Sequence, residues 1–185
     1  MSHSWRSRIV AFVGLGLSLA VAAASAGGDS RVRTPLRVRV PGAAGMGVRR
    51  ALLAARLRLS SSRCRELLSD FQSFEPSLTE VLERLGRTPE QHLDTLVFED
   101  GSGHRRCASP AILAFTRPKS GTVYVCVSQF QSAVRSDPAY AEMILIHELL
   151  HTLGLGENPP TSLAITARVT ERCGDPSIRR AEGSR

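Results

Sequence analysis

The chain has 185 residues, enough for one domain that buries a core without depending on disulfide bonds. Its formal net charge of +7 comes almost entirely from arginine, because Lys119 is the only lysine. Such a skew is readily produced by the codon usage of a GC-rich genome. Neither an aromatic ladder nor a recognisable nucleic-acid-binding module accompanies the charge, so we expect no nucleic-acid partner.

The N-terminal stretch has the organisation of a signal peptide over residues 1–26. Arg6 and Arg8 form a positive start, residues 9–24 are almost wholly apolar, and Ala24-Ser25-Ala26 supplies the small residues that signal peptidase requires. The apolar run is short and rich in alanine and glycine, which favours cleavage over an uncleaved anchor, the alternative. We expect a secreted, periplasmic or cell-envelope protein with no stable membrane span after cleavage.

Residues 27–59 are predicted to form an arginine-rich, flexible leader or linker. The part up to about Gly47 mixes Gly, Pro, Arg and Ser with few large apolar residues and would contribute little to a core. Residues 48–59 have helical spacing, and the pattern leaves open whether they pack on the domain. Ten arginines and no acidic residue fall between Arg31 and Arg65, a composition that can bind acidic polymers or membrane surfaces.

Residues 60–174 are predicted to form the folded domain, of α+β class, and residues 175–185 a disordered tail. The first half of the domain reads as helices. One covers residues 63–71, and a second begins at a cap on Ser77 or Thr79 and ends at Gly86. A third begins at Thr88, with Pro89 at the first helical position.

The apolar pattern then changes to that of strands. Short strands are predicted at residues 96–98, 111–115 and 122–128, with a hairpin connection over residues 117–121. The last strand, in which valines alternate with Tyr124 and Cys126, is a candidate edge to which an extended peptide could add.

The four cysteines of an exported domain predict two disulfides. Three pairings are open. We favour Cys107 with Cys126, which flank the predicted hairpin, and Cys64 with Cys173, which would tie the two ends of the domain together. A zinc site made of cysteines is the competing interpretation, and the absence of a CxxC element disfavours it.

A central helix is predicted from Asp137, a cap, and Pro138, at the first helical position, to about Leu153. Its leucines and isoleucines would be buried around much of its circumference. A polar face on so apolar a helix is costly unless its groups find partners. That face contains the candidate metal-binding residues of this sequence.

His147 and His151 are four residues apart, so both imidazoles lie on one side of the helix and can reach one metal ion. Glu148 stands beside them, where a carboxylate can take a proton from a water molecule. Two nitrogen ligands, a carboxylate base and an open coordination position are what a zinc hydrolase needs. A last helix is predicted over residues 162–173.

The stretch from His147 reads HELLHTLGLGENPP and resembles the zincin metallopeptidases, most closely the metzincin-like pattern HExxHxxGxx(H/D). It also resembles small secreted bacterial proteins that carry metallopeptidase domains. The resemblance implies that His147 and His151 bind zinc and that Glu148 is the general base. Two features depart from the metzincin pattern. Glu157 occupies the third-ligand position, and no methionine follows the helix to form a Met-turn.

The third ligand is therefore open between two glutamates. Glu157 can bind zinc if the chain turns back at Gly154, a residue that tolerates positive φ. Glu171 lies on the predicted last helix, at a position that resembles the glutamate ligand of thermolysin-like zincins. We favour Glu157.

These features predict a secreted zinc-dependent peptidase that acts on a peptide or protein substrate. The alternative is a secreted domain that contains zinc and only binds or scaffolds. A third hypothesis is an envelope-binding protein that acts through its arginine-rich leader. His104, Tyr124 and Tyr140 are weaker candidates for contacts to a substrate.

Overall fold

The computed structural model describes residues 36–174. The predicted signal peptide, the start of the predicted leader and the predicted tail lie outside these residues. Within residues 36–174, no helix is both long and apolar enough to cross a membrane.

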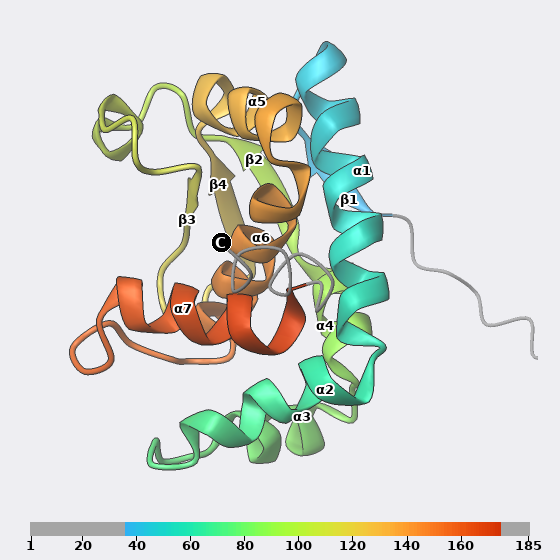
Figure 1. Cartoon of the computed structure of the whole chain (residues 1–185), viewed down its shortest axis with the longest axis vertical. Coiled ribbons are helices and arrows are strands. Elements are labelled where there is room, and N and C mark those ends of the chain that lie inside the picture. Colours follow the sequence, from blue (N-terminus) through green and yellow to red (C-terminus); the bar gives the residue numbers. More distant parts are fainter. Residues whose placement is uncertain (1–35, 175–185) are drawn as a thin grey trace, which may run out of the picture. The chain divides into compact units, whose positions relative to one another are not determined.

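The described domain is α+β, as predicted, and is built on a four-stranded mixed sheet (Figure 1). The strand order is β1-β2-β4-β3, with β1, β2 and β4 parallel and β3 antiparallel to β4. Phe98 in β2 pairs with Val38 on one side and Val123 on the other, and its side chain is fully buried. The strands are β1 (Arg37–Arg39), β2 (Val97–Asp100), β3 (Ala114–Phe115) and β4 (Thr122–Val125).

Helices make up the rest of the domain. The α-helices are α1 (Gly42–Leu59), α2 (Ser62–Arg65), α3 (Leu78–Leu85), α4 (Pro89–Thr95), α5 (Val127–Ser136), α6 (Pro138–Thr152) and α7 (Ser162–Cys173). Two 3-10 helices are η1 (Glu66–Phe71) and η2 (Arg105–Ala108). Helix α6 is central, because α1, α5 and α7 all pack against it (Figure 1).

The prediction of a flexible leader is wrong for residues 36–59. This segment forms the edge strand β1 and the long helix α1, whose inner face is buried against α6. The core-forming side chains of α1 are mostly small, which is why the segment looks poor in core residues; the buried ones are Ala44, Gly45, Val48, Ala51, Leu52, Ala55 and Leu59.

Several arginines of the same segment serve internal contacts. Arg49 donates to the carbonyl oxygen of Val38 at 3.0 Å, and Arg58 pairs with Glu142 of α6 at 2.7 Å. These arginines help to dock α1 and β1.

The predicted starts of α3 and α4 and the end of α3 are confirmed, whereas the single helix predicted over residues 63–71 is divided into α2 and the 3-10 helix η1. Ser77 caps α3 and Thr88 caps α4, each in a capping box with the residue three positions on. Gly86 ends α3 with φ of +61°. Asp137 caps α6 by accepting a hydrogen bond from the backbone N–H of Tyr140 at 3.0 Å.

The predicted hairpin is present, but the second strand is shorter than expected. β4 ends at Val125, and the chain continues directly into α5, which the sequence analysis missed. Because β4 lies between β2 and β3, it is not an edge strand, and the expectation that a peptide adds to it is wrong. The edge on that side of the sheet is β3.

Both favoured disulfides are formed. Cys64 in α2 is bonded to Cys173 at the end of α7, and Cys107 in η2 to Cys126 at the start of α5. The first bond ties the C-terminal helix α7 to α2, which follows α1, across 109 residues of sequence.

Candidate metal centre

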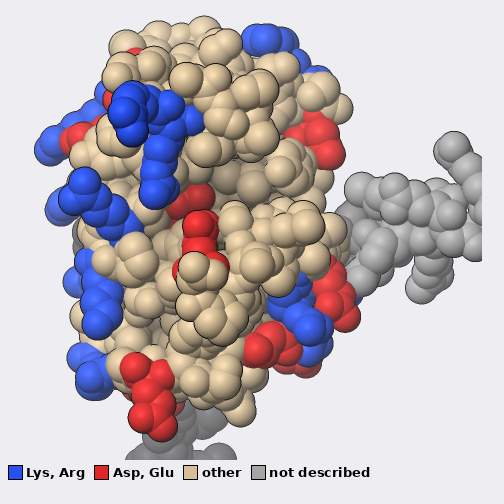
Figure 2. All heavy atoms as spheres, turned by 90° about the vertical axis from the view of Figure 1, so that its left-hand side faces the viewer, with Lys and Arg blue, Asp and Glu red and all other residues tan. Residues whose placement is uncertain are grey.

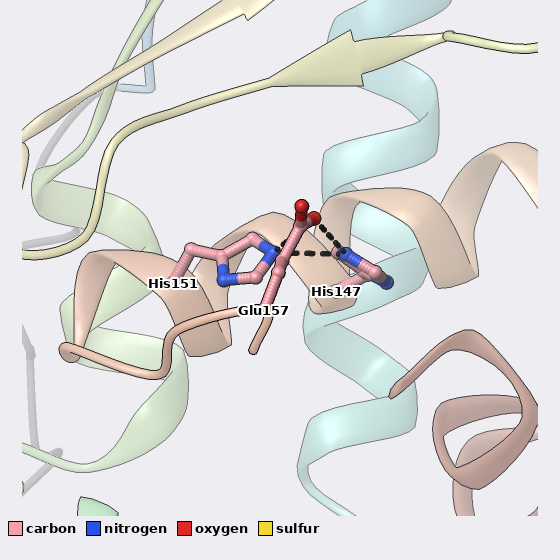
Figure 3. Close-up of side chains that lie close together, drawn as sticks. All are labelled: His147, His151 and Glu157. Atoms are coloured by element: carbon pink, nitrogen blue, oxygen red, sulfur yellow. Dashed lines mark hydrogen bonds and ion pairs between the residues drawn. The ribbon is translucent and has the colours of Figure 1, made fainter. Parts of the chain in front are cut away.

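The polar face of α6 presents two histidines to one point in space. His147 and His151 are both buried, and their Nε2 atoms lie 3.0 Å apart (Figure 3). The helical repeat explains the juxtaposition, because residues four apart are neighbours on a helix surface.

Hydrogen bonds on the other ring nitrogens orient both imidazoles. Nδ1 of His151 lies 2.7 Å from the carbonyl oxygen of Leu155, an acceptor, so Nδ1 carries a proton and, in the neutral ring, Nε2 carries the lone pair. Nδ1 of His147 lies 2.9 Å from the hydroxyl of Thr166 on α7. Such contacts commonly fix the ring orientation of histidines that bind metals.

Burial favours the neutral form that a metal ligand needs. Burial, together with the neighbouring His151, lowers the pKa of His147 to about 3. The hydroxyl of Thr166 can donate or accept, so without a metal Nε2–H of His147 can donate to Nε2 of His151 across the 3.0 Å between them. With Thr166 as the donor, both Nε2 lone pairs face the same point and can bind one cation.

The turn after α6 brings a carboxylate to the same point. Gly154 has φ of +114°, and its N–H donates to the carbonyl oxygen of His151 at 2.8 Å. The chain then reverses, so that Oε1 of Glu157 lies 3.3 Å from Nε2 of His151 and 3.9 Å from Nε2 of His147 (Figure 3). The same turn supplies the Leu155 carbonyl that orients His151.

Within residues 36–174, His147, His151 and Glu157 form the group that can hold a metal ion, with ligand atoms all within 4.8 Å of one another. Two nitrogens bound to one tetrahedral zinc ion at 2.0–2.1 Å lie about 3.3 Å apart. The distances between the ligand atoms here are close to that value, so the group fits zinc.

Glu171, the rival third ligand, is not brought to this group. It lies on α7, where its carboxylate accepts a hydrogen bond from Arg168 at 2.7 Å.

Glu148 is buried next to the histidines and is only partly satisfied. Its Oε2 atom has no hydrogen-bond partner in the described part of the chain. Burial, and then the charge of Glu157, raises the pKa of Glu148 to about 8, against the opposing effects of the Thr116 backbone and of Arg106. A cation bound nearby would lower this pKa again, because it stabilises the carboxylate.

A cavity of about 440 Å³ opens over the group, and Glu148 lies in its wall. The edge strand β3, α6 and the start of α7 border it. In Figure 2, acidic side chains lie in the hollowed middle of the face shown, and basic side chains gather above them and along one side. Two buried histidines, the buried carboxylate of Glu148 and open space for a small molecule thus coincide.

The weaker candidates have different places. Tyr140 lines the metal cavity. His104 and Tyr124 lie away from the metal group, in an aromatic cluster with Phe115 whose ring centroids are 4.8 to 6.4 Å apart. Thr166, which contacts Nδ1 of His147, could not be predicted from the sequence, because a threonine on a helix gives no sign of what it faces.

No family model, no curated protein and no solved structure matches the chain. The fold and the site define a small α+β domain with two disulfides and a group of two buried histidines and one exposed glutamate that can hold a metal ion.

Proposed function

We propose that the protein is a zinc-dependent peptidase that works outside the cytoplasm. The observation that carries the proposal is the convergence of three metal-binding side chains beside the buried carboxylate of Glu148. The resemblance of the stretch from His147 to Pro160 to zincin metallopeptidases supports it. The two disulfides fit an oxidising compartment.

His147, His151 and Glu157 would hold the ion, and their nitrogen and oxygen donors are the ligands that catalytic zinc prefers. Zinc, when bound, supplies a Lewis acid that polarises a carbonyl group and acidifies water. Three protein ligands leave one position of a tetrahedral ion open for these groups.

Glu148 would act as general base and then as general acid. Its carboxylate takes a proton from the attacking water and afterwards delivers that proton to the leaving amine. The free Oε2 atom of Glu148 is available for this role because no side chain of the described part binds it.

The substrate would lie along β3. One side of this strand pairs with β4, while Ala114, Phe115 and Thr116 line the metal cavity. An extended peptide can add to such an edge through main-chain hydrogen bonds, which places a backbone carbonyl near the metal group.

The test is the variant Glu148→Gln. It should keep zinc, measured by metal analysis of the purified protein, and lower kcat on a peptide library by about 100- to 10,000-fold, the usual contribution of a general acid–base group. Full hydrolysis by this variant would refute the mechanism. A wild-type protein that binds zinc but cleaves no member of the library would favour the alternative, a non-catalytic binding domain.

A further inference from the structure

A second cavity, of about 380 Å³, adjoins the metal cavity, and the two share Arg106, Phe115 and Thr116. The proposed function uses none of its other lining residues. Its lining contains no acidic residue, whereas Arg117 adds a second guanidinium to that of Arg106. The cavity therefore has the charge of an anion site.

Arg106 is the central cation of this cavity. Its guanidinium lies over the ring of Phe115, with Cζ 5.5 Å from the ring centroid. It forms no salt bridge with any acidic residue in the described part of the chain. Arg58 and Arg172, by contrast, are paired with carboxylates. The donors of Arg106 are thus free for a ligand.

The segment that carries Arg106 is anchored. The next residue, Cys107, is bonded to the fully buried Cys126. Gln129 of α5 donates to the carbonyl oxygen of Cys107 at 2.6 Å. Because both contacts fix the backbone at Cys107, the backbone that carries Arg106 is positioned beside the cavity before a ligand arrives.

We infer that this cavity is a subsite for a carboxylate of the peptide substrate, recognised by Arg106. A guanidinium matches a carboxylate through two parallel N–H···O hydrogen bonds, and the guanidinium of Arg106 lies over the ring of Phe115. The carboxylate comes from an acidic side chain or from the C-terminus of the peptide. The inference rests on the proposed function in one respect, that the ligand is a peptide lying along β3.

The test measures binding to the zinc-free full-length protein in EDTA, so that neither hydrolysis nor metal–carboxylate contacts contribute. NMR titrations compare three short acetylated peptides of equal length. One has an internal Glu and an amidated C-terminus, one has Gln and an amidated C-terminus, and one has Gln and a free C-terminal carboxylate. We expect one carboxylate peptide to bind about tenfold more tightly than the neutral one, as a charge-assisted bidentate contact allows. The peptide that binds identifies the source of the carboxylate.

Arg106→Gln should abolish the tighter binding of the carboxylate peptide. Arg106→Lys should keep part of it, because lysine retains the positive charge but lacks the two parallel N–H donors of the guanidinium. Arg105→Gln is the matched control, since Arg105 lines neither cavity. Equal binding of all three peptides, or a preference that survives in Arg106→Gln, would overturn the inference. This result can be told apart from that of the hydrolysis assay. If the wild-type protein prefers a carboxylate peptide but hydrolyses none, only the proposed function is contradicted. If it hydrolyses peptides without this preference, only the subsite is contradicted.

Discussion

At the residue scale, the hydrogen bond from Nδ1 of His151 to the Leu155 carbonyl decides which ring nitrogen is free. The free nitrogen, Nε2, faces the same atom of His147 at 3.0 Å. Glu157 completes the group although its side chain is about half exposed (52%). An exposed carboxylate keeps more rotamer freedom than the buried imidazoles. The contribution of Glu157 to zinc affinity is therefore measured directly by substitution.

Glu157→Ala should weaken zinc binding by at least about 100-fold, because loss of even an outer-shell partner costs roughly 10- to 100-fold. Glu171→Ala is the control and should bind zinc like the wild type, since Glu171 is paired with Arg168 on α7. Competition titration with a zinc chelator measures both affinities. Zinc retention by both variants would rule out both glutamates as third ligand.

At the scale of elements, the corner between β1 and α1 depends on a glycine. Gly45 is buried in the first turns of α1, and a Cβ atom at this position would collide with the carbonyl oxygen of Val40. Since the obstacle is backbone and not the end of a flexible side chain, it cannot move without shifting β1 or α1.

Gly45→Ala should therefore lower the free energy of unfolding by about 1–3 kcal/mol, the usual cost of overpacking. Gly47→Ala is the matched control in the same helix, because its Cβ would make only an ordinary contact with Val134 at 3.8 Å. This second variant should gain about 0.5–1 kcal/mol from helix propensity. Denaturant titration under oxidising conditions compares the two, and equal stabilisation by both would show that the corner tolerates a side chain.

At the scale of the whole described domain, α7 is tied to the first helices by several interactions. The Cys64–Cys173 bond closes a loop of about 109 residues, which in the chain-entropy model stabilises by about 4–5 kcal/mol. Beside it, Arg172 donates two hydrogen bonds of 2.7 Å to the carboxylate of Asp70. These contacts hold α7, and with it Thr166, against the metal site.

The Asp70–Arg172 contact predicts a dependence of stability on pH. The hydrogen bond from Arg172, aided by the charges of Arg172 and Arg168, keeps the pKa of Asp70 below its ordinary value. A carboxyl whose pKa is lowered by folding stabilises the fold above its unfolded pKa of about 3.9, and this contribution disappears as pH falls through the folded pKa.

Asp70→Asn should therefore cost about 1–2 kcal/mol at pH 7, and the difference from wild type should shrink as the pH falls below about 4. Glu83→Gln, on the exposed surface of α3, should change stability little at any pH. Urea titrations at several pH values measure both differences. A difference for Asp70→Asn that stays constant down to pH 2 would contradict the assignment.

Much of the local structure follows from the sequence because its causes are local. The caps at Ser77, Thr88 and Asp137 and the left-handed Gly86 each depend on a few consecutive residues. The placement of His147 and His151 on one side of α6 depends only on the helical repeat. The favoured cysteine pairing is also confirmed, although the sequence alone leaves three pairings open.

The features that depend on tertiary packing could not be predicted from the sequence. The core role of α1 rests on small residues such as Ala51 and Ala55, whose close approach to α6 is a tertiary property. The position of β4 inside the sheet is decided by β2 on its far side.

The candidate site also has features that follow from the local sequence and features that depend on tertiary packing. The sequence by itself determined the two histidines, the glutamate between them and the turn at Gly154, because these lie within one helix and its end. Only the tertiary structure brought Glu157 rather than Glu171 to the histidines, set Thr166 behind His147 and placed Arg106 beside the same cavity. Those contacts join distant segments, and their geometry is decided by how α7 and β3 pack against α6 and how η2 is tied to the start of α5.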